Sequence, residues 1–219
     1  MVSFIQGKTI DTDFATNVVD TSLESFGANA IWIFDQNGKL YYDVTNVPNA
    51  NADDLLSITP AQLKNFFTND HALKRRYEFT PSGTFELVIA SVHPGNDQER
   101  KSNPKGYFIA GRLIDETYLE DLSRQSISTV ELIDKDKDNK YQTTFDVSTG
   151  KLAFKRDMPT LDGSIGKEFY VSSVSASTQA FASTYNRLLV AESIGLAATA
   201  LILFFAMLYW VSRPLSLIM

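Results

Sequence analysis

Hydrophobic side chains recur at helical spacing in the N-terminal part of the chain and at strand spacing directly after it. Ile10, Phe14 and Val18 stand four residues apart, which predicts a helix over residues 9–26. The following run, residues 30–44, has β-rich stretches on both sides of an Asn-Gly step. Because Asn-Gly suits the tight turn between paired strands, this run predicts a β-hairpin.

The middle of the chain carries two longer apolar runs that predict central strands. Residues 84–92 (TFELVIASV) and 106–114 (GYFIAGRLI) are apolar on both faces. A strand with two apolar faces needs cover on both sides, so both are expected inside a sheet. Thr59, followed by Pro60 and then by Gln62, predicts a capped helix before them.

The C-terminal half combines further short elements with one long helix. Asp115 predicts the N-terminal cap of a short helix. Three or four more strands are expected over residues 127–174, and a helix is expected from about Ala176 onward. The order of these elements predicts an α+β fold, with a mostly antiparallel sheet flanked by helices.

The stretch of residues 193–211 (SIGLAATALILFFAMLYWV) contains no charged side chain. As a helix it would be about 28 Å long, close to the hydrocarbon thickness of a bilayer. It predicts a transmembrane helix, with a buried core helix as the alternative. Tyr209, Trp210 and Arg213 favour a cytoplasmic C-terminal end, so residues 1–187 are expected outside the cell membrane.

Export of residues 1–187 requires a targeting segment. Residues 1–26 contain no apolar run of the kind found in signal peptides. A first membrane helix is therefore expected before residue 1. Membrane lipid is the expected partner of residues 193–211.

The composition excludes several classes of partner and chemistry. The formal net charge of −6 argues against nucleic acid, which binds basic surfaces. The chain has no cysteine, so disulfides, thiolate metal sites and cysteine nucleophiles are excluded. With 44% hydrophobic and 21% charged residues, the chain is expected to fold around a core.

The sequence carries no recognisable catalytic or metal-binding motif. Its two histidines, His71 and His93, lack the spacing of metal ligands. The acidic run at residues 134–138 resembles the start of a calcium loop, but Asn139 and Phe145 stand where that loop needs Gly and Glu. No catalytic residue, cofactor or metal is therefore predicted. A membrane-anchored enzyme with an unrecognised active site and a structural or interaction ectodomain are the alternatives to a sensor.

Two segments of the sequence resemble the extracellular CHASE domain of the fourth type. GTFELVIASVHP is followed, after a polar loop, by KGYFIAGRLIDETYLEDLSRQ. The residues that match the family pattern are Gly106, Gly111, Arg112, Asp115, Leu119 and Leu122. The resemblance covers roughly residues 1–190 and implies a PAS-like sensor domain of a bacterial or archaeal transmembrane receptor. The Trp-Asp step frequent in the family is absent between Val44 and Leu63, which leaves a Cache or other PAS-like sensor as the alternative.

The resemblance also implies a division of the chain and a further, cytoplasmic output domain. The tail YWVSRPLSLIM resembles the start of a HAMP-type helix at Arg213, Pro214 and Leu215. The implied output is a histidine kinase of a two-component system, a diguanylate cyclase or phosphodiesterase, or a chemoreceptor. The predicted parts are an N-terminal membrane-proximal helix (1–27), the PAS-like sensor domain (28–175), an exit helix (176–192), the transmembrane helix (193–211) and a HAMP-like linker (212–219).

Arg112 is the residue that most favours a ligand site. Strand alternation puts it on one face with Phe108 and Ala110, where an unpaired guanidinium is costly. It is therefore predicted to anchor a small anionic ligand. The alternative is a structural ion pair with an acid such as Asp35 or Asp115. The aromatic residues with polar tips that are predicted to line the site are Trp32, Tyr41, Tyr42, His93 and Tyr107.

A parallel homodimer is predicted from two apolar stripes. The N-terminal helix and the helix from Ala176 carry more apolar side chains than one small sheet covers, among them Phe181 and Tyr185. Paired exit helices can transmit a signal by piston or rotation movements. The alternative is that both stripes pack on the protomer's own sheet.

Overall fold

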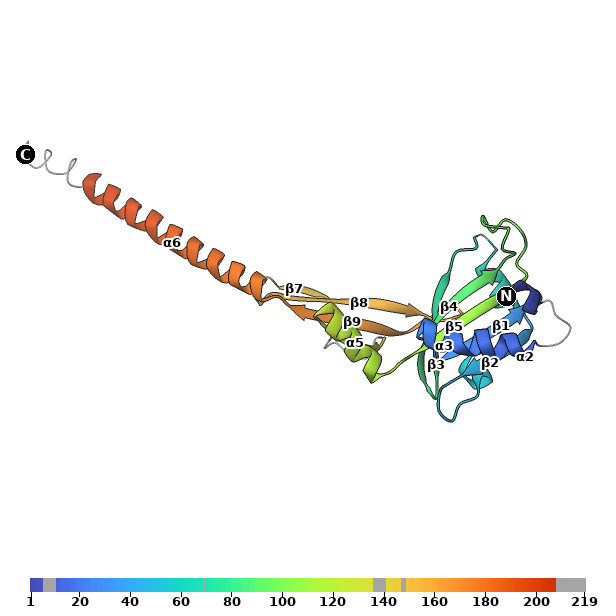
Figure 1. The fold of residues 1–219 in the computed structure, drawn as a ribbon. Coiled ribbons are helices and arrows are strands. Elements are labelled where there is room, and N and C mark those ends of the chain that lie inside the picture. The colour runs from blue at the N-terminus through green and yellow to red at the C-terminus, as the bar shows by residue number, and fades with distance from the viewer. Residues whose placement is uncertain (6–10, 69, 136–140, 147–148, 208–219) are drawn as a thin grey trace, which may run out of the picture. The chain divides into compact units, whose positions relative to one another are not determined.

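The computed structural model describes residues 1–5, 11–68, 70–135, 141–146 and 149–207 of the 219-residue chain. The chain forms two compact units, and Figure 1 labels most of their helices and strands. Unit 1 contains Met1–Tyr141 and Lys155–Val171, and unit 2 contains Gln142–Phe154 and Ser172–Met219. Residues 136–138 of the acidic run and the predicted HAMP-like linker lie outside the described residues.

Unit 1 is built on a five-stranded antiparallel sheet. Its strand order is β2-β1-β5-β4-β3, which places β5 at the centre. The strands are β1 (Ala30–Asp35), β2 (Leu40–Thr45), β3 (Lys74–Thr80), β4 (Gly83–Val92) and β5 (Gly106–Ile114). The predicted hairpin and both predicted long strands are confirmed. The arrangement is that of a PAS-like sheet in an α+β fold, as the sequence predicts.

The sequence pattern does not predict strand β3. Its residues include Lys74, Arg75, Arg76 and Glu78, so it lacks the apolar run that marks a buried strand. β3 pairs with β4 and ends the strand order of the sheet. Charged side chains are typical of such an edge, because they discourage pairing with another chain.

The N-terminal helices cover one face of this sheet, which we call the helix face. They are α1 (Val2–Ile5), α2 (Thr12–Phe14), the π-helical segment η1 (Ala15–Asp20) and α3 (Thr21–Phe26). Phe4 and Val19 pack with Ile31 and Ile33 of β1. The helix predicted over residues 9–26 is confirmed where the structure describes it, and residues 9 and 10 lie outside the described residues.

The opposite face, which we call the loop face, is covered by the segment between β2 and β3 and contains the largest core cluster. This segment holds the 3₁₀ helix η2 (Ala52–Leu55) and α4 (Pro60–Phe66). Thr59 Oγ1 accepts a hydrogen bond from Gln62 N, and Thr59 N donates one to Gln62 Oε1. These two bonds form the predicted cap at the start of α4, so the predicted helix is confirmed. The large side chains buried on this face include Trp32, Leu55, Leu63, Phe85, Leu87, Ile89 and Ile109.

A second sheet follows, with the strand order β6-β9-β8-β7. Its strands are β6 (Thr129–Asp134), β7 (Thr144–Asp146), β8 (Lys151–Pro159) and β9 (Ile165–Val174), and helix α5 (Glu116–Ser126), capped by Asp115 as predicted, precedes them. The tip of the β8–β9 hairpin belongs to unit 1, where Met158 and Leu161 are buried. Thr160 forms a parallel bridge with Tyr77, which attaches the tip to strand β3.

Unit 2 contains β7, one end each of β8 and β9, and helix α6 (Ala176–Met207). Ser175 N donates to Gly150 O at 3.0 Å and Gln179 Nε2 donates to Thr149 O at 2.7 Å, so the turn before β8 is held to the start of α6. α6 begins at Ala176, as predicted. Within the described part of the chain it is the one helix long and apolar enough to cross a membrane, with a mean hydropathy of 2.2 and none of that stretch buried.

Candidate functional site

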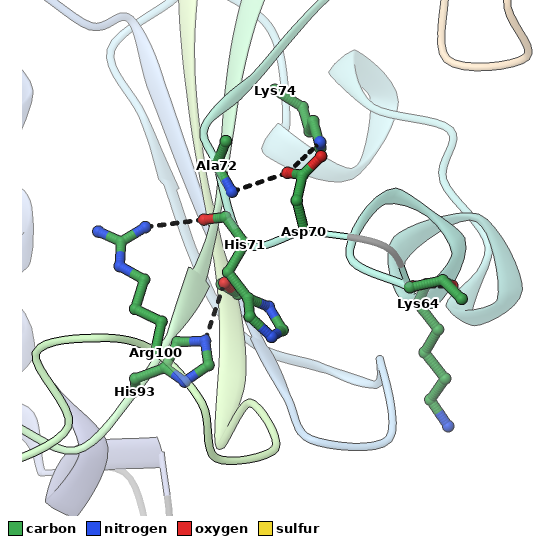
Figure 2. A network of polar contacts seen from close by, with 9 residues as sticks. Lys64, Asp70, His71, Ala72, Lys74, His93 and Arg100 are labelled. Carbon is green, nitrogen blue, oxygen red and sulfur yellow. Dashed lines mark hydrogen bonds and ion pairs between the residues drawn. The ribbon is translucent and has the colours of Figure 1, made fainter.

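Two histidines form the centre of a polar cluster on the loop face of unit 1, shown in Figure 2. His93 follows β4 and His71 precedes β3, and their ring centroids lie 4.7 Å apart, edge to face. The His93 side chain is 4% exposed, and its Nε2 shares a hydrogen bond of 3.0 Å with Ser91 Oγ. Phe67 stacks on both His71 and Tyr107. An aromatic row therefore runs from Tyr107 through Phe67 to His71 and His93.

The loop between β4 and β5 supplies the charged groups of this cluster. Asp97 Oδ2 lies 3.4 Å from His93 Nδ1, but no hydrogen bond from a described residue reaches that nitrogen. Burial, followed by the neighbouring His71, lowers the pKa of His93 below 6.5, while Asp97 acts in the opposite direction. Hydrogen bonds from Ser102 hold the pKa of Asp97 well below its usual range. Arg100 Nη1 donates to His71 O at 2.8 Å, which ties the loop to the histidine pair (Figure 2).

A polar cleft of about 270 Å³ opens in unit 1 between β3, the start of α4 and the tip of the β8–β9 hairpin. Asp162 accepts hydrogen bonds from Thr160 Oγ1 and Ser164 N, and these bonds lower the pKa of Asp162 to about 2. Burial, followed by the charge of Asp162, raises the pKa of Glu78 above 4.5. The polar lining consists of Ser57, Gln62, Glu78, Thr160, Asp162 and Ser164.

Arg112 lies on the helix face and binds the end of the N-terminal helices. Its Nε donates to Gly27 O at 2.7 Å and its Nη2 donates to Phe26 O at 2.9 Å. These carbonyls stand at the C-terminal end of α3, where a cation offsets the helix dipole. The guanidinium also lies 5.6 Å from the ring centroid of Tyr118 on α5. Arg112 thus joins α3, β5 and α5.

The structural alternative for Arg112 named the wrong partners, Asp35 and Asp115. Asp35 accepts backbone N–H bonds from its own hairpin turn, and Asp115 accepts from Tyr118 N at the start of α5. The guanidinium binds the two helix carbonyls instead. The role of Arg112 as the anchor of an anionic ligand stays a prediction.

The loop face holds three of the predicted ligand residues. Trp32 is buried in the core and donates its indole N–H to Ala52 O at 3.0 Å. Tyr107 is buried beside the histidine cluster, and it is paired in register with Ser91, the partner of His93. Tyr107 and His93 are therefore brought together, while Trp32 serves the core.

The helix face holds the remaining predicted ligand residues, Tyr41, Tyr42 and Arg112. Tyr41 meets Phe4 edge to face, with ring centroids 5.2 Å apart. Tyr42 OH donates to Asp20 Oδ1 at 2.8 Å, and burial together with this bond raises the pKa of Tyr42 to about 12. These residues hold the N-terminal helices, and the thickness of the sheet separates them from His93 and Tyr107. The predicted ligand residues thus do not converge on one pocket.

The sequence patterns predicted neither the polar cleft nor the contact between the two histidines. The cleft depends on Glu78, which belongs to the unpredicted strand β3. Alternation in that strand was the available signal, because it places Lys74, Arg76 and Glu78 on one face. The histidine contact joins two loops, which no spacing rule relates. Among the described residues, no three His, Asp or Glu side chains are placed to hold a metal ion.

Comparison with solved structures gives weak likenesses. A crystal structure of the Vibrio cholerae LuxQ periplasmic domain in selenomethionine form is 12% identical, with a TM-score of 0.43, over 80% of this chain and 86% of that chain. A second structure of the same domain is 13% identical, with a TM-score of 0.38, over 74% and 79%. Values this low transfer neither ligand nor partner to this chain.

Comparison with sequences gives a family. No curated protein matches the chain. Residues 1–133 match the model of the CHASE4 domain, which is more than half of the chain, although the resemblance noted from the sequence extended to about residue 190. The matched part ends in β6 and includes the whole five-stranded sheet. The chain therefore belongs to the CHASE4 family of extracytoplasmic sensor domains.

Proposed function

We propose that this chain is the sensor region of a transmembrane signalling receptor, in which unit 1 binds a small ligand and α6 carries the signal across the membrane. The observation that carries this proposal is the direct passage from β9 into α6, with Ser175 alone between them. The chain acts by binding, and catalysis belongs to a separate output domain. That domain is a histidine kinase, a diguanylate cyclase or phosphodiesterase, or a chemoreceptor output.

Residues 193–211 are the proposed membrane span. A helix in the core of a soluble protein buries at least one side. By contrast, α6 exposes large apolar side chains throughout its described part, namely Ile194, Leu196, Leu201, Ile202, Leu203, Phe204, Phe205 and Met207. Burying such surface is favourable by about 25 cal/mol per Å² relative to water, and lipid tails provide that burial.

The β8–β9 hairpin is the proposed route between ligand and membrane. Its tip is attached to strand β3 through the bridge between Thr160 and Tyr77. Met158 supports this attachment from the buried side, in one cluster with Tyr77 and Ile114. Since β9 leads into α6, a movement of the tip relative to β3 is passed along the strands to the helix.

A parallel homodimer is the proposed assembly. Phe181 and Tyr185 stack with ring centroids 6.3 Å apart, and they are 68% and 53% exposed. Both precede the proposed span, so lipid does not cover them. A second copy anchored in the same membrane presents the same stripe at the same height, which suits a twofold interface.

Introduced cysteines test the span and the assembly together, because the chain has no cysteine of its own. In intact cells, a membrane-impermeant thiol reagent should label a cysteine at position 140 and leave one at position 216 unlabelled. Phe181→Cys and Tyr185→Cys should give disulfide-linked dimers in native membranes. A cysteine in place of the exposed Glu120 on α5 serves as the control for random collision.

The reverse labelling pattern would refute the orientation. Crosslinks no stronger than those of the Glu120→Cys control, at every position tested along residues 176–192, would refute the dimer. The two outcomes are independent, since a monomeric receptor can have the proposed orientation.

A further inference from the structure

Glu78 is the carboxylate in the cleft that lacks a protein partner. Among the described residues, no hydrogen bond or ion pair reaches it, whereas Asp162 is satisfied by its own turn. Glu78 is half-buried, and the charge of Asp162, which has the same sign, adds to the effect of burial in raising the pKa of Glu78. Burying a carboxylate without a partner costs free energy, and an ion pair with a cation offsets that cost.

The rest of the lining fits the uncharged parts of an organic molecule. None of the described residues that line the cleft is basic. Ser57, Gln62, Thr160 and Ser164 offer neutral donors and acceptors, and the hydroxyls of Thr160 and Ser164 already contact each other at 2.8 Å. Phe79 and Leu161 add apolar surface against which a carbon chain can pack.

We infer that this cleft binds a small organic molecule with an ammonium group, and that Glu78 is its charge partner. This inference rests on the proposed sensor function and names the ligand class. An anion would face two carboxylates, which repel it. A bare metal ion would need six to eight oxygen ligands if it were calcium. The volume of about 270 Å³ is many times the roughly 10–15 Å³ that one water needs by the same measure, so the cleft has room for an amine with a short chain.

The position of the cleft connects binding to the route toward α6. Glu78 comes from β3, Gln62 from α4, and Thr160, Asp162 and Ser164 from the hairpin tip. A ligand that bonds both Glu78 and the tip hydroxyls draws the tip toward β3. The bridge between Thr160 and Tyr77 lies at the same place, so binding strengthens a contact that already exists.

Thermal unfolding of the full chain in lipid nanodiscs tests the inference, with putrescine and ethanolamine as the ammonium probes. Both should raise the melting temperature of unit 1, while succinate, erythritol and calcium chloride should not. Glu78→Gln keeps the shape of the side chain and should weaken binding about tenfold to a hundredfold, since it removes a charge-assisted bond. Asp157→Asn is the matched control, because Asp157 is exposed on the same hairpin outside the cleft.

Without a probe, Glu78→Gln should melt at the wild-type temperature or above it, since it removes an unpaired charge. A lost response in this variant is then not the result of unfolding. The inference is overturned if neither amine shifts the wild type, if calcium alone does so, or if Glu78→Gln responds like Asp157→Asn. The cysteine labelling and crosslinking do not involve the cleft, so an overturned ligand class leaves the sensor proposal standing.

Discussion

Large apolar side chains are buried in unit 1 and exposed in helix α6 of unit 2. In unit 1, Trp32 is 1% exposed and Leu63 is 0% exposed. In α6, Phe181 is 68% exposed, Leu188 is 58% exposed and Leu203 is 64% exposed. Unit 1 therefore buries its apolar side chains within itself, whereas those of α6 are exposed, which is why a membrane span and a dimer are proposed for this helix.

This contrast separates two sources of stability. The sheet of unit 1 is covered on both faces by its own chain, so its stability is a property of the monomer. The large apolar side chains of α6 are exposed, so under the proposed function this helix gains stability from lipid or from a second copy. Variants in the two regions should accordingly respond to different conditions.

The largest expected effect comes from truncating the core of unit 1. Trp32→Ala should lower the free energy of unfolding by about 3–5 kcal/mol, because it leaves a cavity and an unbonded Ala52 carbonyl. Phe181→Ala should change it by less than about 0.5 kcal/mol in detergent micelles that keep the chain monomeric. Denaturant unfolding followed by circular dichroism measures both. Equal losses in the two variants would show that α6 packs on its own protomer.

Local patterns were sufficient to predict many elements of the fold. The Asn-Gly turn, the cap at Thr59 and the apolar runs of β4 and β5 each rest on neighbours in the sequence. The start of α6 at Ala176 follows from the same kind of evidence. These local patterns are reliable because each element forms hydrogen bonds, or spaces its apolar residues, within its own short stretch of sequence.

Contacts between distant segments could not be predicted in the same way. Arg112 binds Gly27 O across 85 positions, and the sequence offered only the expectation that a buried guanidinium needs a partner. Glu78 meets the hairpin tip because Thr160 bridges to Tyr77, a pairing that no periodicity encodes. The sequence therefore predicted none of the residues that line the polar cleft, and the ligand role of Arg112 and its companions stays a prediction.

A moderate effect is expected from breaking the contact between Arg112 and α3. Arg112→Gln removes two charge-assisted hydrogen bonds and should cost about 1–3 kcal/mol, a fall of a few degrees in melting temperature. Gly27→Ala should give a similar loss, since its Cβ would lie 2.5 Å from Arg112 Nη2 and φ is +56°. Arg112→Lys should lose less, because the charge near the helix end remains.

These melting temperatures also separate the two roles considered for Arg112. A residue that anchors an anionic ligand can be replaced without loss in the ligand-free protein. Wild-type stability of Arg112→Gln in the absence of ligand would therefore contradict the structural role and favour the anchor.

The smallest expected effect is a pH dependence confined to the histidine cluster. Since the pKa of His93 is lowered in the folded chain, the unfolded chain takes up the proton first as the pH falls through 6.5, and stability should decline. The groups that face His93 are His71, Asp97 and Arg100. His93→Gln keeps a partner for Ser91 and should melt at nearly the same temperature at pH 7.5 and pH 5.5, whereas the wild type should melt at a lower temperature at pH 5.5 than at pH 7.5.

The interval from pH 7.5 to 5.5 isolates this effect from the carboxylates of unit 1. Asp97 and Asp162 have lowered pKa values, so their contributions are lost only in more acidic solution. Glu78 and Asp43 have raised pKa values, and their protonation would favour the folded chain as the pH falls, which is the opposite sign. The melting temperatures of His93→Gln, subtracted from those of the wild type at each pH, remove the contributions of these four carboxylates. A difference that is flat with pH would mean that His93 titrates alike in the folded and unfolded chain, which would contradict the lowered pKa of His93.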